Sequence, residues 1–193
     1  ATGKNGSIIH YRASNKTCRE IKQNDVYLCD SGGQYTYGTT DVTRTISFKA
    51  QPKNIKDNFT RVLKGHIAVA TANISKQKNG SNIDKLARKH LLEVKKDFKH
   101  GTGHGVGYFL NVHEGPQAIS KRNYVKLREG MILSNEPGFY LQGKYGIRIE
   151  NLVYIKKDKN NLVFKNLTLA PIDIDLINFK LLSTQEKKYL INY

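Results

Sequence analysis

The sequence lacks the features that mark several special classes of protein. It has two cysteines and four prolines in 193 residues, and its start shows neither Met nor the apolar core of a secretory signal. No apolar run approaches the roughly 20 residues of a membrane-spanning helix, so we expect no membrane partner. Cys18 and Cys29 do not make a disulfide framework, which favours a reducing cytoplasm, and we expect Cys29, in an apolar run, to be buried. With 38% hydrophobic residues, the chain has the composition of an ordinary folded protein.

Acidic residues are also scarce, and the formal net charge is +16. The excess is mostly lysine, with 24 Lys against 8 Arg. The lysines are scattered, and they lack the clustering and aromatic interleaving of a nucleic-acid-binding surface. We therefore expect them to form a solvated surface and predict no nucleic-acid partner.

The hydrophobic pattern predicts one α+β domain over residues 1–193. Apolar residues at helical spacing predict helices at 55–75 and 83–98, the second one capped by Ser81 or Asn82. The chain should end in a helix that begins with a capping box at Ser183. Strands are expected at 7–11, 25–30, 34–37, 42–48, 131–134, 146–156 and 162–169, with a turn at Gly32-Gly33 between the second and third. This order favours a curved antiparallel sheet with helices over one face.

The stretch His100–Pro116 holds three of the six histidines, at His100, His104 and His113, together with five glycines. Glycine has no Cβ, so such a segment can bring its backbone close to a ligand. Histidines set among glycines in this way indicate a site more than a core. By contrast, His66 and His90 lie on the predicted helices, where we expect packing or surface roles.

Four acidic residues lie in or next to predicted strands. Asp30 ends one strand, and Asp41 follows on the far side of a glycine-rich loop, so a hairpin could bring the two carboxylates together. Glu136 precedes Pro-Gly, and Glu150 lies in an alternating strand on the same face as Arg148. A carboxylate on a half-buried strand is costly unless it is paired or binds a metal.

Four carboxylates and one imidazole form an oxygen-rich ligand set that suits hard cations such as Mn or Mg, and the imidazole also admits Zn or Co. Their negative charge is too great for one divalent ion and matches two, which can share a bridging water. Each acid alone has a simpler reading: Asp30 or Asp41 as a turn former, and Glu150 as an ion-pair partner of Arg148. The combination favours a metal site.

Several segments together resemble the catalytic domain of the Xaa-Pro aminopeptidases, metallopeptidases with the pita-bread fold. The resemblance covers nearly the whole chain. It is carried by Ile8-Ile-His-Tyr11, Asp30-Ser-Gly-Gly-Gln-Tyr35, Gly38-Thr-Thr-Asp-Val-Thr-Arg-Thr45, Leu63-Lys-Gly-His-Ile-Ala68, the stretch 100–116, Asn135-Glu-Pro-Gly-Phe-Tyr140 and Gly146-Ile-Arg-Ile-Glu-Asn151.

The resemblance implies a function and a role for each matching residue. The expected reaction is hydrolysis of the bond between an N-terminal residue and a following proline, by a hydroxide that bridges two divalent ions, usually Mn²⁺. The implied metal ligands are Asp30, Asp41, His104, Glu136 and Glu150. Glu136 would also transfer a proton, His10, His100 and His113 would contact the substrate or its oxyanion, and Arg148 and Tyr140 would support the site.

The sequence also departs from the family. In that family the catalytic domain normally begins some tens of residues before the position of Ala1 and follows further domains. We therefore expect this chain to be the C-terminal part of the domain, incomplete at its N-terminus. That leaves open a fragment, a split-gene product or a binding module. Prolidase and methionine aminopeptidase share the fold and remain alternatives, and a homodimer is also left open.

Overall fold

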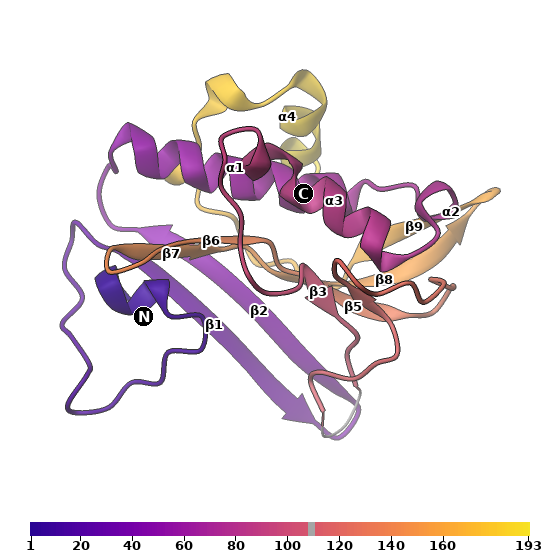
Figure 1. The fold of residues 1–193 in the computed structure, drawn as a ribbon, viewed down its shortest axis with the longest axis horizontal. Helices are drawn as coiled ribbons and strands as arrows, with labels where there is room; N and C mark the ends of the chain where they lie inside the picture. The colour runs from indigo at the N-terminus through magenta and orange to yellow at the C-terminus, as the bar shows by residue number, and fades with distance from the viewer. Residues whose placement is uncertain (108–110) are drawn as a thin grey trace.

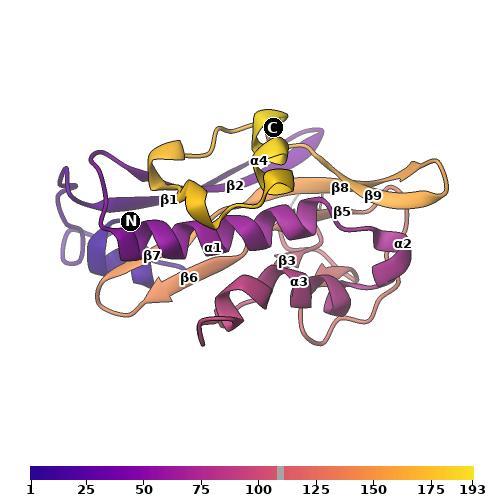
Figure 2. The same cartoon turned by 90° about the horizontal axis from the view of Figure 1, so that it is seen from above.

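The computed structural model describes residues 1–107 and 111–193. Three helices, α1 (Lys53–Ala70), α3 (Gly80–Leu92) and α4 (Thr184–Ile191), lie along one side of a layer of strands (Figures 1 and 2). Short helical segments are η1 (Gly3–Ser7), α2 (Ile74–Gln77), η2 (Ile174–Leu176) and η3 (Phe179–Leu181). The predicted arrangement, helices over one face of an antiparallel layer, is therefore present.

The longest strands, β1 (Val26–Tyr35) and β2 (Gly38–Ser47), form one antiparallel hairpin that crosses the molecule diagonally in Figure 1. The predicted turn at Gly32-Gly33 is wrong, because β1 continues through both glycines and the chain reverses only after Tyr35. A Cβ on Gly32 would lie 2.6 Å from the Thr40 carbonyl oxygen, so glycine here permits close strand pairing.

Within the described part of the chain, the other strands build three small antiparallel sheets. One has the order β5-β8-β9, and the other two are the pairs β3-β4 and β6-β7. Isolated bridges from Thr43 to Glu150 and from Gly105 to Leu133 connect the sheets. The strand bounds are β3 Gly103–His104, β4 Ala118–Ile119, β5 Ile132–Asn135, β6 Gly138–Leu141, β7 Tyr145–Arg148, β8 Asn151–Asp158 and β9 Asn161–Asn166.

Helix α1 packs against both the strands and helix α3. Its residues Phe59, Val62 and Leu63 are buried in one core cluster, and Val69 lies in a second with residues of α3 and β8. Each such side chain contributes roughly 1.5–3 kcal/mol by leaving water. Gly65 packs against α3 so closely that a Cβ there would lie 2.2 Å from the Ala87 carbonyl oxygen.

Two predicted helices end earlier than the apolar pattern indicated. The first breaks after Ala70 and resumes as α2. The second begins at Gly80, because the Asn79 side chain, rather than Ser81 or Asn82, caps it. It ends at Leu92, where Lys95 takes a left-handed φ of 57° and the Lys96 N–H donates to the Leu91 carbonyl at 3.0 Å. That turn is typical of a helix C-terminus.

Three further local predictions have clear outcomes. The prediction of a strand at 7–11 is wrong, because η1 and a turn occupy this region. Thr2, before η1, forms a β-bridge to Tyr27. The predicted burial of Cys29 is also wrong, because this free thiol is half-buried on β1. The capping box at Ser183 is confirmed, with both of its hydrogen bonds to Glu186 present.

Among the described residues, no helix is both long and apolar enough to cross a membrane.

Candidate metal centre

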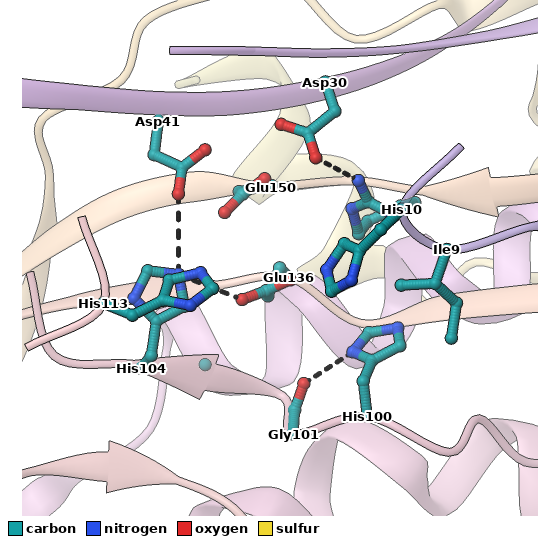
Figure 3. Close-up of a pocket in the computed structure, with 12 residues that line it drawn as sticks. Ile9, His10, Asp30, Asp41, His100, Gly101, His104, His113, Glu136 and Glu150 are labelled. Atoms are coloured by element: carbon teal, nitrogen blue, oxygen red, sulfur yellow. Dashed lines mark hydrogen bonds and ion pairs between the residues drawn. The ribbon is translucent and has the colours of Figure 1, made fainter. Parts of the chain in front are cut away.

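A cavity of about 250 Å³ lies between the β1–β2 hairpin and the glycine-rich segment (Figure 3). It collects nearly all of the side chains singled out from the sequence. Its lining residues are Ile9, His10, Asp30, Asp41, His100, Gly101, Gly103, His104, His113, Glu136, Arg148 and Glu150.

The hairpin register explains how Asp30 and Asp41 come together. Asp30 lies opposite Thr43, and Asp41 lies opposite Gly32, so the two carboxylates are diagonal neighbours on one face. Both point from the hairpin into the cavity (Figure 3). The expected proximity of the two acids across a hairpin is confirmed, and the ladder continues through Gly32 and Gly33 before the chain turns.

Glu150 is not in the middle of a strand, as predicted, but in the break between β7 and β8, where it bridges to Thr43. It is 2% exposed, and the Thr43 hydroxyl donates to its Oε2 at 2.5 Å. Arg148 does not form an ion pair with it. The guanidinium of Arg148 pairs with Asp30 instead, so the simple ion-pair reading of Glu150 does not describe this site.

His104, on β3, presents one specific ring nitrogen to the acids. Its Nδ1 donates to the Gly105 carbonyl at 2.9 Å, which leaves Nε2 facing Asp41 Oδ2 at 3.5 Å and Glu136 Oε1 at 3.3 Å. A histidine ligand is commonly oriented by such a bond from its second nitrogen. Glu136 is itself held by the Ser134 hydroxyl, which donates to Oε1 at 3.0 Å.

The donor atoms fall into two overlapping groups. Asp30, Asp41 and Glu150 have ligand atoms within 4.8 Å of one another, and so do His104, Glu136 and Glu150. Glu150 belongs to both groups, so the geometry suits two neighbouring cations that share a carboxylate. A third group, Asp41, His104 and His113, brings His113 nearer to these atoms than the sequence prediction assumed.

The electrostatics show why cations fit this cavity. Burial, together with the charges of Glu136 and Asp41, raises the pKa of Glu150 to about 8. Burial raises the pKa of Glu136 to about 7. For His104, burial lowers the pKa, but the hydrogen bonds to Asp41 and to the Gly105 carbonyl, together with the charges of Glu136 and Asp41, outweigh burial and raise the pKa to about 9. The acids are thus too crowded to ionise together, and hard oxygen donors with one imidazole suit divalent ions such as Mn²⁺, Zn²⁺ or Co²⁺.

A chain of hydrogen bonds connects Arg148 and His100, two residues that line the cavity. Arg148 bonds Asp30 and donates from Nη1 to the Tyr140 hydroxyl at 2.9 Å. That hydroxyl in turn donates to His100 Nε2 at 2.9 Å, because His100 Nδ1 donates to the Gly101 carbonyl at 2.7 Å. Burial lowers the pKa of His100 to about 4, so its ring is neutral. The structure therefore brings together Arg148, Tyr140 and His100, as the prediction required.

The other two histidines lie at the open side of the cavity. His10 is exposed and follows η1, and His113 is exposed with its ring centroid 4.0 Å from that of His104. Figure 3 shows both rings directed toward the same space as the carboxylates. Residues 108–110 of the glycine-rich stretch lie outside the described residues.

Sequence reasoning missed two polar residues that hold the acids in place. Thr43 bonds Glu150, and Ser134 bonds both Glu136 and the backbone N–H of His104. A signal was available, since each hydroxyl stands two residues from a candidate ligand in an extended segment and therefore on the same face.

The fold and the converging carboxylates define a site that could hold divalent cations, and a family comparison assigns the fold. The family model for metallopeptidase family M24 matches residues 1–157, and the chain belongs to that family.

Particular relatives agree with this. The chain is 50% identical over 203 residues to a protein of Laccaria bicolor and 49% identical over 205 residues to one of Coprinopsis cinerea, each named a probable Xaa-Pro aminopeptidase P. Both alignments cover 100% of this chain. They cover 32% and 33% of the relatives, so the chain spans about a third of their length.

Solved structures show the same fold. The X-prolyl aminopeptidase of Caenorhabditis elegans, described as a cytosolic enzyme with a dinuclear active site, aligns with a TM-score of 0.93 at 42% identity. That alignment covers 100% of this chain and 33% of the other. The prolidase of Pyrococcus furiosus aligns with a TM-score of 0.77 at 29% identity, covering 88% and 48%. The predicted α+β pita-bread fold is therefore confirmed.

Proposed function

We propose that this chain carries the catalytic site of an Xaa-Pro aminopeptidase, which hydrolyses the peptide bond before a proline in the second position. The observation that carries this proposal is the convergence of four carboxylates and His104 Nε2 in one cavity, as two donor groups that share Glu150. The names of the relatives supply the substrate class. We further propose that residues 1–193 form one domain and act in the cytoplasm.

The proposed ligands are the five residues of the two donor groups: Asp30, Asp41, His104, Glu136 and Glu150. They would hold two divalent ions, with Mn²⁺ as the first choice and Zn²⁺ or Co²⁺ as alternatives. When bound, such a pair of ions acidifies a water molecule and polarises the carbonyl of the bond to be cleaved.

The residues of the chain would handle protons and the substrate. Glu136 lies within the donor cluster and would accept a proton and pass it toward the leaving proline nitrogen. His113 and His10, which are exposed and line the cavity, would donate to the carbonyl oxygen as negative charge develops on it. In this structure both ring nitrogens of His100 are engaged, so we assign to His100 part of the wall against which the substrate rests, with Tyr140 bonded to its ring.

The test is a substrate panel with a count of bound ions. The purified chain, and any longer protein that contains it, would be loaded with Mn²⁺, Zn²⁺ or Co²⁺ and given Xaa-Pro tripeptides, Xaa-Pro dipeptides and Xaa-Ala peptides. We expect two ions per chain and cleavage of the longer Xaa-Pro peptides. Asp41→Asn should lose ion binding and at least about 100-fold of the activity, whereas Asp158→Asn, a matched change on the exposed end of β8, should not.

Prolidase activity is the second candidate, and a specific observation favours it: solved prolidases share the fold at TM-scores of 0.77 and 0.78. Cleavage of Xaa-Pro dipeptides alone would establish it. Two bound ions without cleavage of any peptide, or no bound ions at all, would refute the aminopeptidase proposal and favour a binding module or inactive fragment.

A further inference from the structure

The helix α3 carries a buried ion pair that the proposed function does not use. Asp84 and Arg88 lie one helical turn apart and are 1% and 3% exposed. Arg88 Nε donates to Asp84 Oδ2 at 2.7 Å. Both side chains lie beneath the segment that leads from α3 to His104, and Arg88 borders a second cavity on the far side of His100 and Gly101.

Arg88 binds the backbone of that segment directly. Its Nη2 donates to the carbonyl of His100 at 2.7 Å, and its Nη1 donates to the carbonyl of Phe98 at 2.6 Å and to Asp97 at 2.7 Å. The guanidinium carbon also lies 3.9 Å from the centre of the Phe98 ring. Since residues 96–101 belong to no strand, these contacts replace the ladder that would otherwise fix the backbone at His100.

Asp84 reaches the other side of the site. Its Oδ1 accepts from the Thr102 hydroxyl at 2.7 Å, and Thr102 is fully buried. The Thr102 carbonyl accepts the backbone N–H of Glu136 at 2.7 Å. One ion pair thus connects, through two short paths, the backbone of His100 and the backbone of Glu136.

We propose that Asp84 and Arg88 are positioning residues for the proposed reaction: Arg88 sets the place of His100, and Asp84 sets that of Glu136 through Thr102. Neither side chain lines the cavity that holds the carboxylates. The inference rests on the proposed function, and it predicts that this ion pair controls turnover more than substrate binding.

The chemistry of arginine makes the proposal specific. A guanidinium presents several N–H groups in a rigid plane, so it can bond Asp84 and two carbonyls at once, whereas the ammonium of lysine is a single point of charge. Arg88→Ala would leave the buried Asp84 without its cation and would confuse a positioning effect with unfolding. Arg88→Lys and Thr102→Val are therefore the informative variants.

The kinetic test compares these variants with wild type, each loaded with Mn²⁺ and corrected for folded protein and bound ions. We expect kcat to fall about 10–100-fold in both variants, because a displacement of about 1 Å costs that much. KM should change less than about threefold, and at saturating Mn²⁺ the ion count should stay at the wild-type value. Thr102→Ser keeps the hydroxyl and should therefore have the wild-type kcat. Lys89→Met, on the exposed face of α3, should have no effect on kcat.

A second measurement does not depend on the reaction. Amide hydrogen exchange over residues 98–104 should become at least about tenfold faster in Arg88→Lys, while α1 keeps its protection. Wild-type exchange, or a loss of kcat that only follows the loss of folded protein, would overturn the proposal. If the wild-type chain cleaves no Xaa-Pro peptide, the proposed function fails, and the exchange result still decides whether this pair holds the segment.

Discussion

His66 offers a quantitative test of how the structure depends on pH. It lies on α1, is 0% exposed, and its carbonyl accepts the Asn135 side chain at 3.0 Å, directly before Glu136. Burial and the nearby charge of Arg44 lower its pKa from 6.5 to about 3. The folded chain therefore keeps this ring neutral, while the unfolded chain protonates it below pH 6.5.

The sign and size of the effect follow from proton linkage. Between pH 6.5 and 3 the unfolded state binds more protons at this residue, so stability falls as pH falls. At pH 5, which is about 1.5 units below the unfolded pKa, the loss amounts to about 2 kcal/mol at roughly 1.4 kcal/mol per unit. Above pH 7.5 the residue contributes no pH dependence.

The assay is urea denaturation of the ion-free chain at pH 8, 7, 6 and 5. The chain has no tryptophan and 11 tyrosines, so circular dichroism and tyrosine fluorescence are suitable signals. His66→Gln should lower stability at pH 8 and remove about 2 kcal/mol of the decline between pH 8 and pH 5. His10→Gln, an exposed histidine, serves as the matched control. If the free energy of unfolding falls by the same amount between pH 8 and pH 5 in wild type and in His66→Gln, the reasoning is refuted.

Three more predictions concern the metal centre. Thr43→Val removes the 2.5 Å bond to Glu150 and should weaken ion binding about 10–100-fold, measured by calorimetry, whereas Thr43→Ser should not. Gly103→Ala would place a Cβ 1.9 Å from the Ser134 carbonyl oxygen, so we expect a lower melting temperature and lost activity; wild-type values would show that this close approach is unnecessary. Because the pKa values of Glu136 and Glu150 are about 7 and 8 without ions, ion uptake at neutral pH should release protons and weaken from pH 8 to pH 6. Titrations in buffers of different ionisation enthalpy measure that release, and its absence would contradict the raised pKa values.

The carboxylates of the site could be predicted from the sequence because strands limit where acids can lie. Asp30 and Asp41 stand in an extended pattern, where a carboxylate on a half-buried strand is costly unless it is paired or binds a metal. Their exact pairing could not be predicted, because Gly32 looked like a turn residue although the ladder continues through it. Pairing across the hairpin, a tertiary feature, decided the register.

The supporting residues were harder to find, because their partners are backbone atoms far away in the sequence. Asp84 and Arg88 have the spacing of an ordinary exposed helical ion pair. Only the path of the chain after α3 shows that Arg88 meets the His100 carbonyl. The end of that helix depends on the left-handed turn at Lys95, which the apolar spacing did not indicate.

The chain as a whole is strongly basic, whereas its cavity is lined by acids. The sequence carries +16 overall, yet the cavity gathers four carboxyl groups beside Arg148 and His104, and ion uptake displaces the protons that these groups hold without ions. At physiological ionic strength, charges are screened over about 8 Å, so the exposed lysines repel an approaching cation only weakly. The buried acids are screened much less, and within the cavity their short separations dominate. Ion affinity should therefore be set by Asp41, Glu136 and Glu150 and change little with salt, whereas the rate at which peptides arrive should depend on salt through the lysines.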